Sequence, residues 1–237
     1  MHDVFRSILL IGRPAAGKSE VIDYLKRTPT AERSRRFHIG ELVEIDDFPF
    51  LWEKFEEDDL LEAHGRPRQW TTSDYWFTDD WFWTFMILKI NRAYERFAAA
   101  GAPGSTALVE FSRGGPNGFG AAFSHLSEAI RRESGLVYIR VSYEESVRKN
   151  QRRHRPGQEH SVLHHSLPDA KMEHYYKTND WDAVSGGRDA GEIDMAGLCV
   201  PFVVFDNEPE VTDRPEALGA RLEEVCTRLW RTMAKRV

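Results

Sequence analysis

The sequence has little cysteine and no long apolar run. Only two of its 237 residues are cysteines, Cys199 and Cys226, and their spacing is not that of metal ligands. A disulfide framework is therefore not expected, and a reducing compartment is the default. No apolar run approaches the roughly 18 residues that span a membrane, and the first apolar strand begins too early to leave room for a signal peptide. We expect a cytoplasmic protein with no membrane partner.

The overall charge excludes one further class of partner. The formal net charge is −6, which argues against a nucleic-acid surface as the main partner. Hydrophobic residues make up 41% of the chain and charged residues 30%, the balance of a soluble globular protein. The length suits one domain with a full core, and no internal repeat is visible. The oligomeric state stays open.

Apolar runs alternate with helical patterns along the whole chain. Short β-branched and apolar runs predict five strands, at about 7–11, within 37–48, and at 106–111, 136–141 and 200–205. Helical periodicity predicts helices at about 18–27, 51–63, 80–100, 119–133, 144–154 and 215–235. This alternation predicts an α/β fold of three α/β/α layers around a five-stranded, mostly parallel sheet. One domain is expected over 1–237.

The most specific pattern follows the first predicted strand. The eight residues from Gly12 to Ser19 match the phosphate-loop spacing G-x-x-x-x-G-K-[ST], and they read Gly12, Arg13, Pro14, Ala15, Ala16, Gly17, Lys18 and Ser19. The glycines permit backbone angles that turn successive N–H groups toward an anion, and the helix that follows adds its positive end. Lys18 is predicted to reach the β- and γ-phosphates, and Ser19 to ligate Mg²⁺. We expect residues from Gly12 to Glu20 to bind a nucleoside triphosphate.

Carboxylates end two of the other predicted strands. Asp46 and Asp47 close the second strand, and Glu110 closes the third in the run Val109-Glu110-Phe111. Open α/β sheets place their ligand chemistry at this edge. An aspartate there can take the proton of an attacking hydroxyl, and either Asp46 or Asp47 fits that role.

Two segments extend the domain. Residues 48–100 form an insertion rich in aromatic residues, and its cluster at 70–85 fits either a buried core or a pocket for a planar ligand. Residues 144–197 are expected to form a lid, in which Arg148, Arg152 and Arg155 share one helix face. Four histidines, at 160, 164, 165 and 174, lack the companion motifs of a zinc site.

The order of these parts resembles the small-molecule kinases of the P-loop superfamily, which include nucleoside and nucleotide kinases and the shikimate and gluconate type. The resemblance covers most of the layout, although only the phosphate loop is a specific sequence match. It implies that Asp46 or Asp47 accepts the acceptor's proton, and that Glu110 holds the Mg²⁺ water shell or the acceptor. It also implies that Arg113 binds the acceptor.

Further roles follow from the same resemblance. Arginines after the fourth strand would close over the phosphates as a lid, and Arg148, Arg152, Arg153 and Arg155 match them. Residues 206–209 would lie near the adenine. The chain differs from these kinase families after the third strand, where it reads Glu110-Phe111-Ser112-Arg113. Nucleoside monophosphate kinases have D-G-x-P-R at this place, and deoxynucleoside kinases have E-R-S. The resemblance is therefore not taken to imply that the acceptor is a nucleotide.

The sequence favours an ATP- and Mg²⁺-dependent kinase whose partner is a small-molecule acceptor. No N-K-x-D or D-x-x-G follows the expected strands, which argues against a GTP switch, and the lone Glu110 is unlike the Asp-Glu pair of motor ATPases. Two alternatives remain: a nucleotide-binding regulatory protein that uses the aromatic insertion as a partner surface, and a slow ATPase without an acceptor.

Overall fold

A six-stranded sheet forms the centre of the computed structural model, which describes residues 4–153 and 167–234. The strands are β1 (Ser7–Gly12), β2 (Glu41–Asp46), β3 (Ser105–Phe111), β4 (Ser134–Arg140), β5 (Ala190–Met195) and β6 (Leu198–Asp206). Their order is β2-β3-β1-β4-β6-β5, and all neighbours are parallel except the β5–β6 pair. The innermost strand, β1, is buried along its whole length, which explains its unbroken apolar run.

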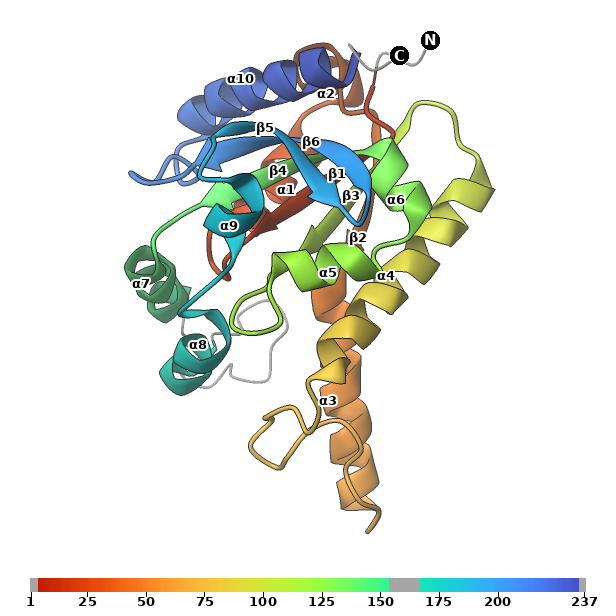
Figure 1. Ribbon diagram of the computed structural model, residues 1–237, viewed down its shortest axis with the longest axis vertical. Coiled ribbons are helices and arrows are strands. Elements are labelled where there is room, and N and C mark those ends of the chain that lie inside the picture. Colours follow the sequence, from red (N-terminus) through yellow and green to blue (C-terminus); the bar gives the residue numbers. More distant parts are fainter. Residues whose placement is uncertain (1–3, 154–166, 235–237) are drawn as a thin grey trace.

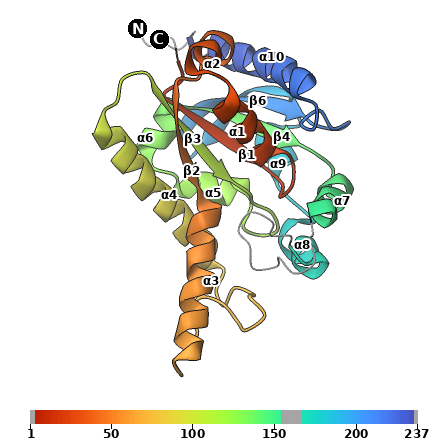
Figure 2. The ribbon, with the colours of Figure 1, turned by 180° about the vertical axis from the view of Figure 1, so that it is seen from behind.

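Helices cover both faces of the sheet (Figures 1 and 2). One face packs against α1 (Lys18–Arg27), α2 (Thr30–Phe37) and α10 (Pro215–Ala234) through a core that includes Leu10, Val137 and Leu222. The other packs against α4 (Trp81–Ala100), α5 (Phe119–His125), α6 (Glu128–Glu133) and α9 (Trp181–Ser185) through a core that includes Leu9 and Val109. Alternate residues of β1 thus serve opposite cores, and the predicted three-layer α/β/α fold is confirmed.

Three more helices lie at the carboxyl-terminal side of the sheet. They are α3 (Asp47–Ala63), α7 (Tyr143–Arg153) and α8 (Asp169–Tyr176). Figures 1 and 2 show α3 projecting well beyond the sheet, with the following loop running back beside it. Within the described ranges, no helix has the length and apolar composition that crossing a membrane requires.

The sheet has one strand more than predicted. The additional strand, β5, pairs antiparallel with β6 at the sheet edge, where only Ile193 and Met195 are buried. Its other side chains are polar or small, so it lacks the apolar run by which the inner strands were identified. The predicted helix at 119–133 is also divided, because Ser127 accepts a hydrogen bond from the Ile130 N–H and starts a new helix, α6.

The basic run at 33–36 lies within α2. Arg33 within α2 is only 4% exposed. Its guanidinium donates to the carbonyl oxygens of Leu25 and Gly40 at 2.7 and 2.8 Å, and thereby binds the end of α1 to the chain entering β2. These partners allow a charge to be buried there.

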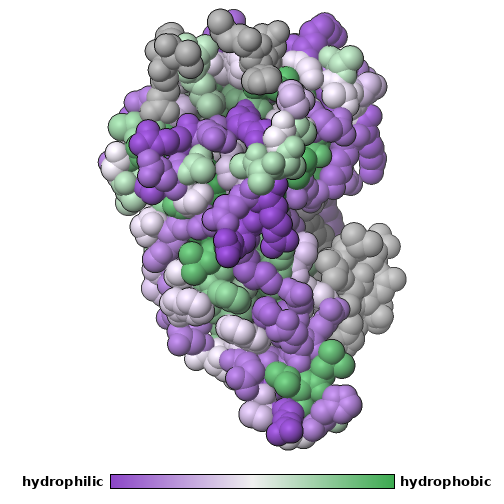
Figure 3. Space-filling model, turned by 90° about the vertical axis from the view of Figure 1, so that its right-hand side faces the viewer, coloured by the Kyte–Doolittle hydropathy of each residue, from purple (hydrophilic) through white to green (hydrophobic). Residues whose placement is uncertain are grey.

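The acidic run at 56–59 contains one buried carboxylate. Asp58 is completely buried and accepts hydrogen bonds from the Gln69 and Thr71 N–H groups, each at 2.7 Å. It therefore holds the returning loop against α3. Figure 3 shows apolar side chains near the lower end of the molecule. Near the end of α3, Leu60 is 62% exposed.

Replacing Arg33 should test its role in joining α1 to β2. Arg33→Met keeps the aliphatic stem but leaves buried carbonyl oxygens without their charged donor, so we expect a loss of about 2–4 kcal/mol in unfolding free energy. Urea denaturation followed by circular dichroism measures it. The matched control is the exposed Arg35→Met, for which a change within about 0.5 kcal/mol is expected. Equal losses in the two variants would contradict the assignment.

Candidate functional site

A cavity of about 480 Å³ lies where the parallel strands end. Its walls come from the loop after β1, the junction of β2 and α3, the end of β3, and α7 and α8. This size suits a small ligand, and the site has the position expected in an open parallel sheet. Of the predicted site residues, ten line it directly: Pro14, Ala15, Lys18, Ser19, Glu20, Asp46, Asp47, Glu110, Arg113 and Arg152.

The loop between β1 and α1 has the backbone of an anion-binding turn. Ala15 has a φ of 54° and Gly17 a φ of 115°, so both lie in the left-handed region. Gly12 has to lack a side chain, because a Cβ there would meet the Ile139 carbonyl oxygen at 2.7 Å. Gly17 caps α1 without a side-chain hydrogen bond, which leaves the first N–H groups of that helix for a ligand.

Three neighbouring elements hold this loop in place. The buried Asn207, directly after β6, donates from Nδ2 to the Ala16 carbonyl oxygen at 2.7 Å. Ser146 of α7 donates to the Pro14 carbonyl oxygen at 2.7 Å, and Arg13 donates to the Tyr176 carbonyl oxygen at the end of α8. The loop is therefore fixed from the sheet and from both helices beside the cavity.

Lys18 joins the loop to the end of β3. Its side chain is 6% exposed, and Nζ donates to the Ser112 hydroxyl at 2.7 Å and to the Arg13 carbonyl oxygen at 3.1 Å. A carboxylate oxygen of Glu110 lies 3.7 Å from the same nitrogen. The predicted lysine and the predicted β3 carboxylate thus meet in one cavity.

The carboxylates of β2 and β3 are neighbours because the strands pair in register, with Asp46 opposite Glu110. Asp46 also starts α3, and its Oδ1 accepts a hydrogen bond from the Phe48 N–H at 2.9 Å. Burial, together with the nearby Glu110 and Asp47, raises the pKa of the Asp46 carboxyl to about 8. This acid can exchange a proton near neutral pH.

Asp47 has a cationic partner. Its Oδ2 accepts a hydrogen bond from Arg113 Nη1 at 2.6 Å, and both side chains are almost fully buried. The Arg113 guanidinium lies between two rings, 5.1 Å from the Trp83 centroid and 5.2 Å from the Phe111 centroid. The two adjacent aspartates therefore have different environments: Asp46 lies among acids, and Asp47 is paired with a cation.

The oxygen groups at this edge suit a hard cation. Ser19 is exposed and lines the cavity, and carboxylate oxygens of Glu44, Asp46 and Glu110 lie within 4.8 Å of one another. Glu44 also forms an ion pair with Lys26 of α1. Hydroxyl and carboxylate oxygens are the ligands that Mg²⁺ prefers, so the residues present fit this ion.

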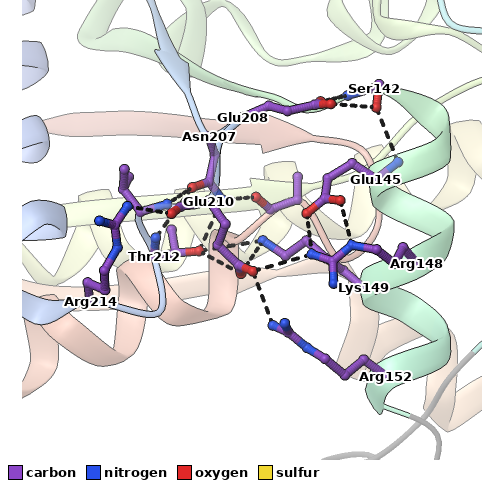
Figure 4. A network of polar contacts seen from close by, with 12 residues as sticks. Ser142, Glu145, Arg148, Lys149, Arg152, Asn207, Glu208, Glu210, Thr212 and Arg214 are labelled. Atoms are coloured by element: carbon purple, nitrogen blue, oxygen red, sulfur yellow. Dashed lines mark hydrogen bonds and ion pairs between the residues drawn. The ribbon is translucent and has the colours of Figure 1, made fainter.

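Arg148 and Arg152 of α7 are engaged with acidic side chains (Figure 4). Arg152 lines the cavity and lies 3.1 Å from Glu210 in the loop after β6. Arg148 is paired with Glu145 at 2.6 Å and does not line the cavity. The buried Lys149 also binds Glu210, at 2.6 Å, which ties α7 to that loop. The predicted residues Arg155, His160, His164 and His165 lie outside the described part of the chain.

The aromatic cluster at 70–85 divides between the two expected roles. Trp83 lines the cavity, whereas Phe82 is buried and stacks on Phe77 with centroids 4.4 Å apart. Trp81 is 51% exposed, stacks on Phe85 with centroids 5.4 Å apart, and does not line the cavity. One ring of the cluster therefore lines the cavity, next to Tyr176 of α8.

Several residues of the site were not singled out from the sequence. They are Ser112, Asn150, Tyr176 and Glu210. Asn207 belongs to the range 206–209 that the resemblance placed near the adenine, although its contact with the phosphate loop was not predicted. The others lie on helices or in loops that only tertiary folding brings to the cavity.

No protein-family model and no curated protein matches the sequence. Among solved structures, the chain is similar to a gluconokinase from Sinorhizobium meliloti 1021, with 18% identity, coverage of 97% of this chain and 98% of that one, and a TM-score of 0.47. The chain is also similar to a sugar kinase from Janibacter sp. HTCC2649, with 13% identity, coverage of 93% of this chain and 94% of that one, and a TM-score of 0.47. A shikimate kinase from Acinetobacter baumannii, solved with shikimate, has 13% identity to the chain, coverage of 68% of this chain and 73% of that one, and a TM-score of 0.33. At these values, substrate and chemistry have to be inferred from the chain's own residues.

The pH dependence of stability should report on Asp46. Its folded-state pKa of about 8 lies well above the usual pKa of an aspartate, so the folded protein holds a proton that the unfolded chain releases. The unfolding free energy should therefore fall as pH rises from about 4 to about 8 and change little from this cause above that range. In Asp46→Asn this component is absent, so melting temperatures between pH 5 and 9, without nucleotide or metal, should fall less than in the unmodified protein. An unchanged pH slope in the variant would contradict the assignment.

Proposed function

We propose that this protein is an ATP- and Mg²⁺-dependent kinase that phosphorylates a hydroxyl group of a small molecule. The observation that carries the proposal is that one cavity contains both a phosphate loop with its lysine and a pair of aspartates at the end of the neighbouring strand. A protein that only binds a nucleotide needs the first of these; phosphoryl transfer needs both.

The loop and Lys18 form the donor half of the site. The first amides of α1 and the left-handed turn at Ala15 can hold phosphate oxygens, while Lys18 is anchored by Ser112 close to Glu110. Mg²⁺, when bound, would supply positive charge that offsets the negative charge of the phosphates. Ser19 and Glu110 are the residues that would hold the ion in this proposal, Glu110 through a carboxylate oxygen or a bound water.

The two aspartates belong to the acceptor half and have separate roles in the proposal. Asp46 is the general base, because a carboxyl whose pKa lies near the working pH takes up a hydroxyl proton most effectively. Asp47 is held by Arg113 at the cavity wall, where its carboxylate can accept hydrogen bonds that orient the acceptor. Arg113 then acts through Asp47 as a positioning residue.

Lys18→Ala tests the donor half. It removes the cation predicted to contact the transferred phosphate, so ATP-dependent phosphorylation should fall to background. The fold, followed by circular dichroism, should be retained, because the removed side chain leaves β1 and α1 intact. Lys177→Ala is the control, since this exposed lysine directly after α8 forms an ion pair with Glu173 of that helix and does not line the cavity. Normal turnover by Lys18→Ala would exclude this site.

The variants Asp46→Asn and Asp47→Asn distinguish the general base from the residue that orients the acceptor. Asp46→Asn should lower kcat roughly 10²–10⁴-fold with ATP affinity retained, because an amide cannot take the proton. Asp47→Asn should mainly raise KM for the acceptor. Steady-state kinetics and calorimetric titration with a non-hydrolysable ATP analogue measure these effects. An unchanged kcat in Asp46→Asn would remove the base assignment.

The same assays separate the two alternatives. A regulatory protein would bind ATP without turnover against a broad metabolite panel. A slow ATPase would release ADP at a rate independent of any acceptor. The kinase proposal requires ADP release that rises with the acceptor and matches the amount of phosphorylated product.

A further inference from the structure

We propose that the outward face of α4 binds a second copy of this chain, with the two α4 helices lying antiparallel across a twofold axis. Trp81, Phe85, Leu88 and Arg92 define this face, which we call the α4 seam. The inference concerns assembly and does not depend on the proposed kinase function. It rests on the exposure, the spacing and the order of charges along one helix.

The α4 seam lies on the side of the helix that faces away from the core. The core side of α4 includes Met86 and Ile90, which are completely buried. On the outward side, Trp81 is 51% exposed and Leu88 39% exposed, and the Arg92 side chain is 75% exposed. Two large apolar side chains therefore remain in water on a helix that already has a complete core contact of its own.

The seam has the spacing of a contact between two helices. Trp81, Phe85, Leu88 and Arg92 follow one another at intervals of four, three and four positions. Side chains at these intervals stay on one side of a helix, and two helices that carry them can interdigitate over several turns. An exposed apolar residue on its own is ordinary, whereas apolar residues in this register form a stripe that a partner helix can cover.

The apolar part of the seam continues onto α3. Trp81 and Trp70 both stack on the Phe85 ring, with centroids 5.4 and 5.2 Å from it. Trp70 also lines a groove of about 440 Å³, together with Leu60 and Leu61 of α3. Figure 3 faces the side on which α4 lies in Figure 1, and apolar areas are visible there. A stable dimer buries about 800 Å² on each copy, more than one helix face supplies, and this groove provides adjoining surface.

The charges along α4 favour a second copy as the occupant. Asp79 and Asp80 directly precede the helix, whereas Arg92 and Arg96 lie in its second half. Asp79, Asp80 and Arg96 are exposed, and none of them forms an ion pair within residues 4–153 and 167–234. Antiparallel pairing places the acidic start of each copy beside the basic half of the other, whereas parallel pairing would bring like charges together. The face is thus complementary to itself.

One register satisfies the apolar stripe and the charges together. With the twofold axis midway between Phe85 and Leu88, Phe85 of each copy meets Leu88 of the other, and Trp81 meets Arg92. The indole can then take the guanidinium on its face. Asp80 lies within one helical turn of Arg96 of the other copy. Each of these contacts occurs twice, as a twofold interface requires.

The first test is the mass of the full-length protein in solution. Light scattering and sedimentation velocity over a concentration series should give a mass that approaches twice the 27.4 kDa of one chain. Because the exposed stripe would then be covered on both copies, the dimer should persist in high salt. Protein that remains monomeric up to about 100 µM would overturn the inference.

Leu88→Arg tests whether the α4 seam is the interface. It places a cation at the centre of the apolar stripe, so the dimer dissociation constant should rise about thirtyfold or more. Ala220→Arg is the control, because it adds the same charge at an exposed position of α10, on the other face of the sheet. Circular dichroism should show that both variants fold. Equal dimerisation of Leu88→Arg and the unmodified protein would overturn the inference.

An exchange of charges tests the antiparallel register. Asp80→Arg and Arg96→Asp should each weaken the dimer about threefold to tenfold, because each removes an attraction that occurs twice. The combined variant restores the opposite charges in reversed order, so most of the affinity should return. A combined variant no tighter than the weaker single variant would rule out this register and overturn the inference.

Discussion

The candidate site depends on the burial of one ammonium group. Lys18 is almost completely removed from solvent, and a charge in that position is tolerated only when hydrogen bonds and an opposite charge compensate it. Its partners come from its own loop, from Ser112 and from Glu110. The position of this lysine therefore requires that β1 and β3 end side by side, as the sheet order provides.

The same constraint explains why acids accumulate around the loop. Parallel pairing places Asp46 opposite Glu110, and the next residue, Asp47, enters α3 toward Arg113. Two adjacent carboxyl groups are thereby given different chemistry. One is held among acids with a raised pKa, and the other is held by a guanidinium between two rings. Environments that differ in this way separate a proton acceptor from an orienting group.

The sequence predicted what local pattern controls. The β1–loop–α1 unit, the inner strands and the apolar stripe of α10 follow from periodicity and from glycine and lysine spacing, and the structure contains them. Arg33 and Asp58 show where such reasoning stops. Both belong to charged runs typical of solvated surface, yet both are buried, because carbonyl or N–H groups from distant residues surround them. Strand β5 was missed for a related reason, since an edge strand needs few apolar residues.

By itself, the sequence determined the phosphate loop, the three-layer architecture and the strand ends at which acids would lie, because these depend on short-range spacing and on strand periodicity. Only the tertiary structure decided which charges are neighbours. The pairing of Asp47 with Arg113 joins residues 66 positions apart, and that of Lys18 with Ser112 joins residues 94 positions apart. Electrostatic interactions depend on distance and burial in the folded state, so the different environments of Asp46 and Asp47 exist only once the sheet has formed.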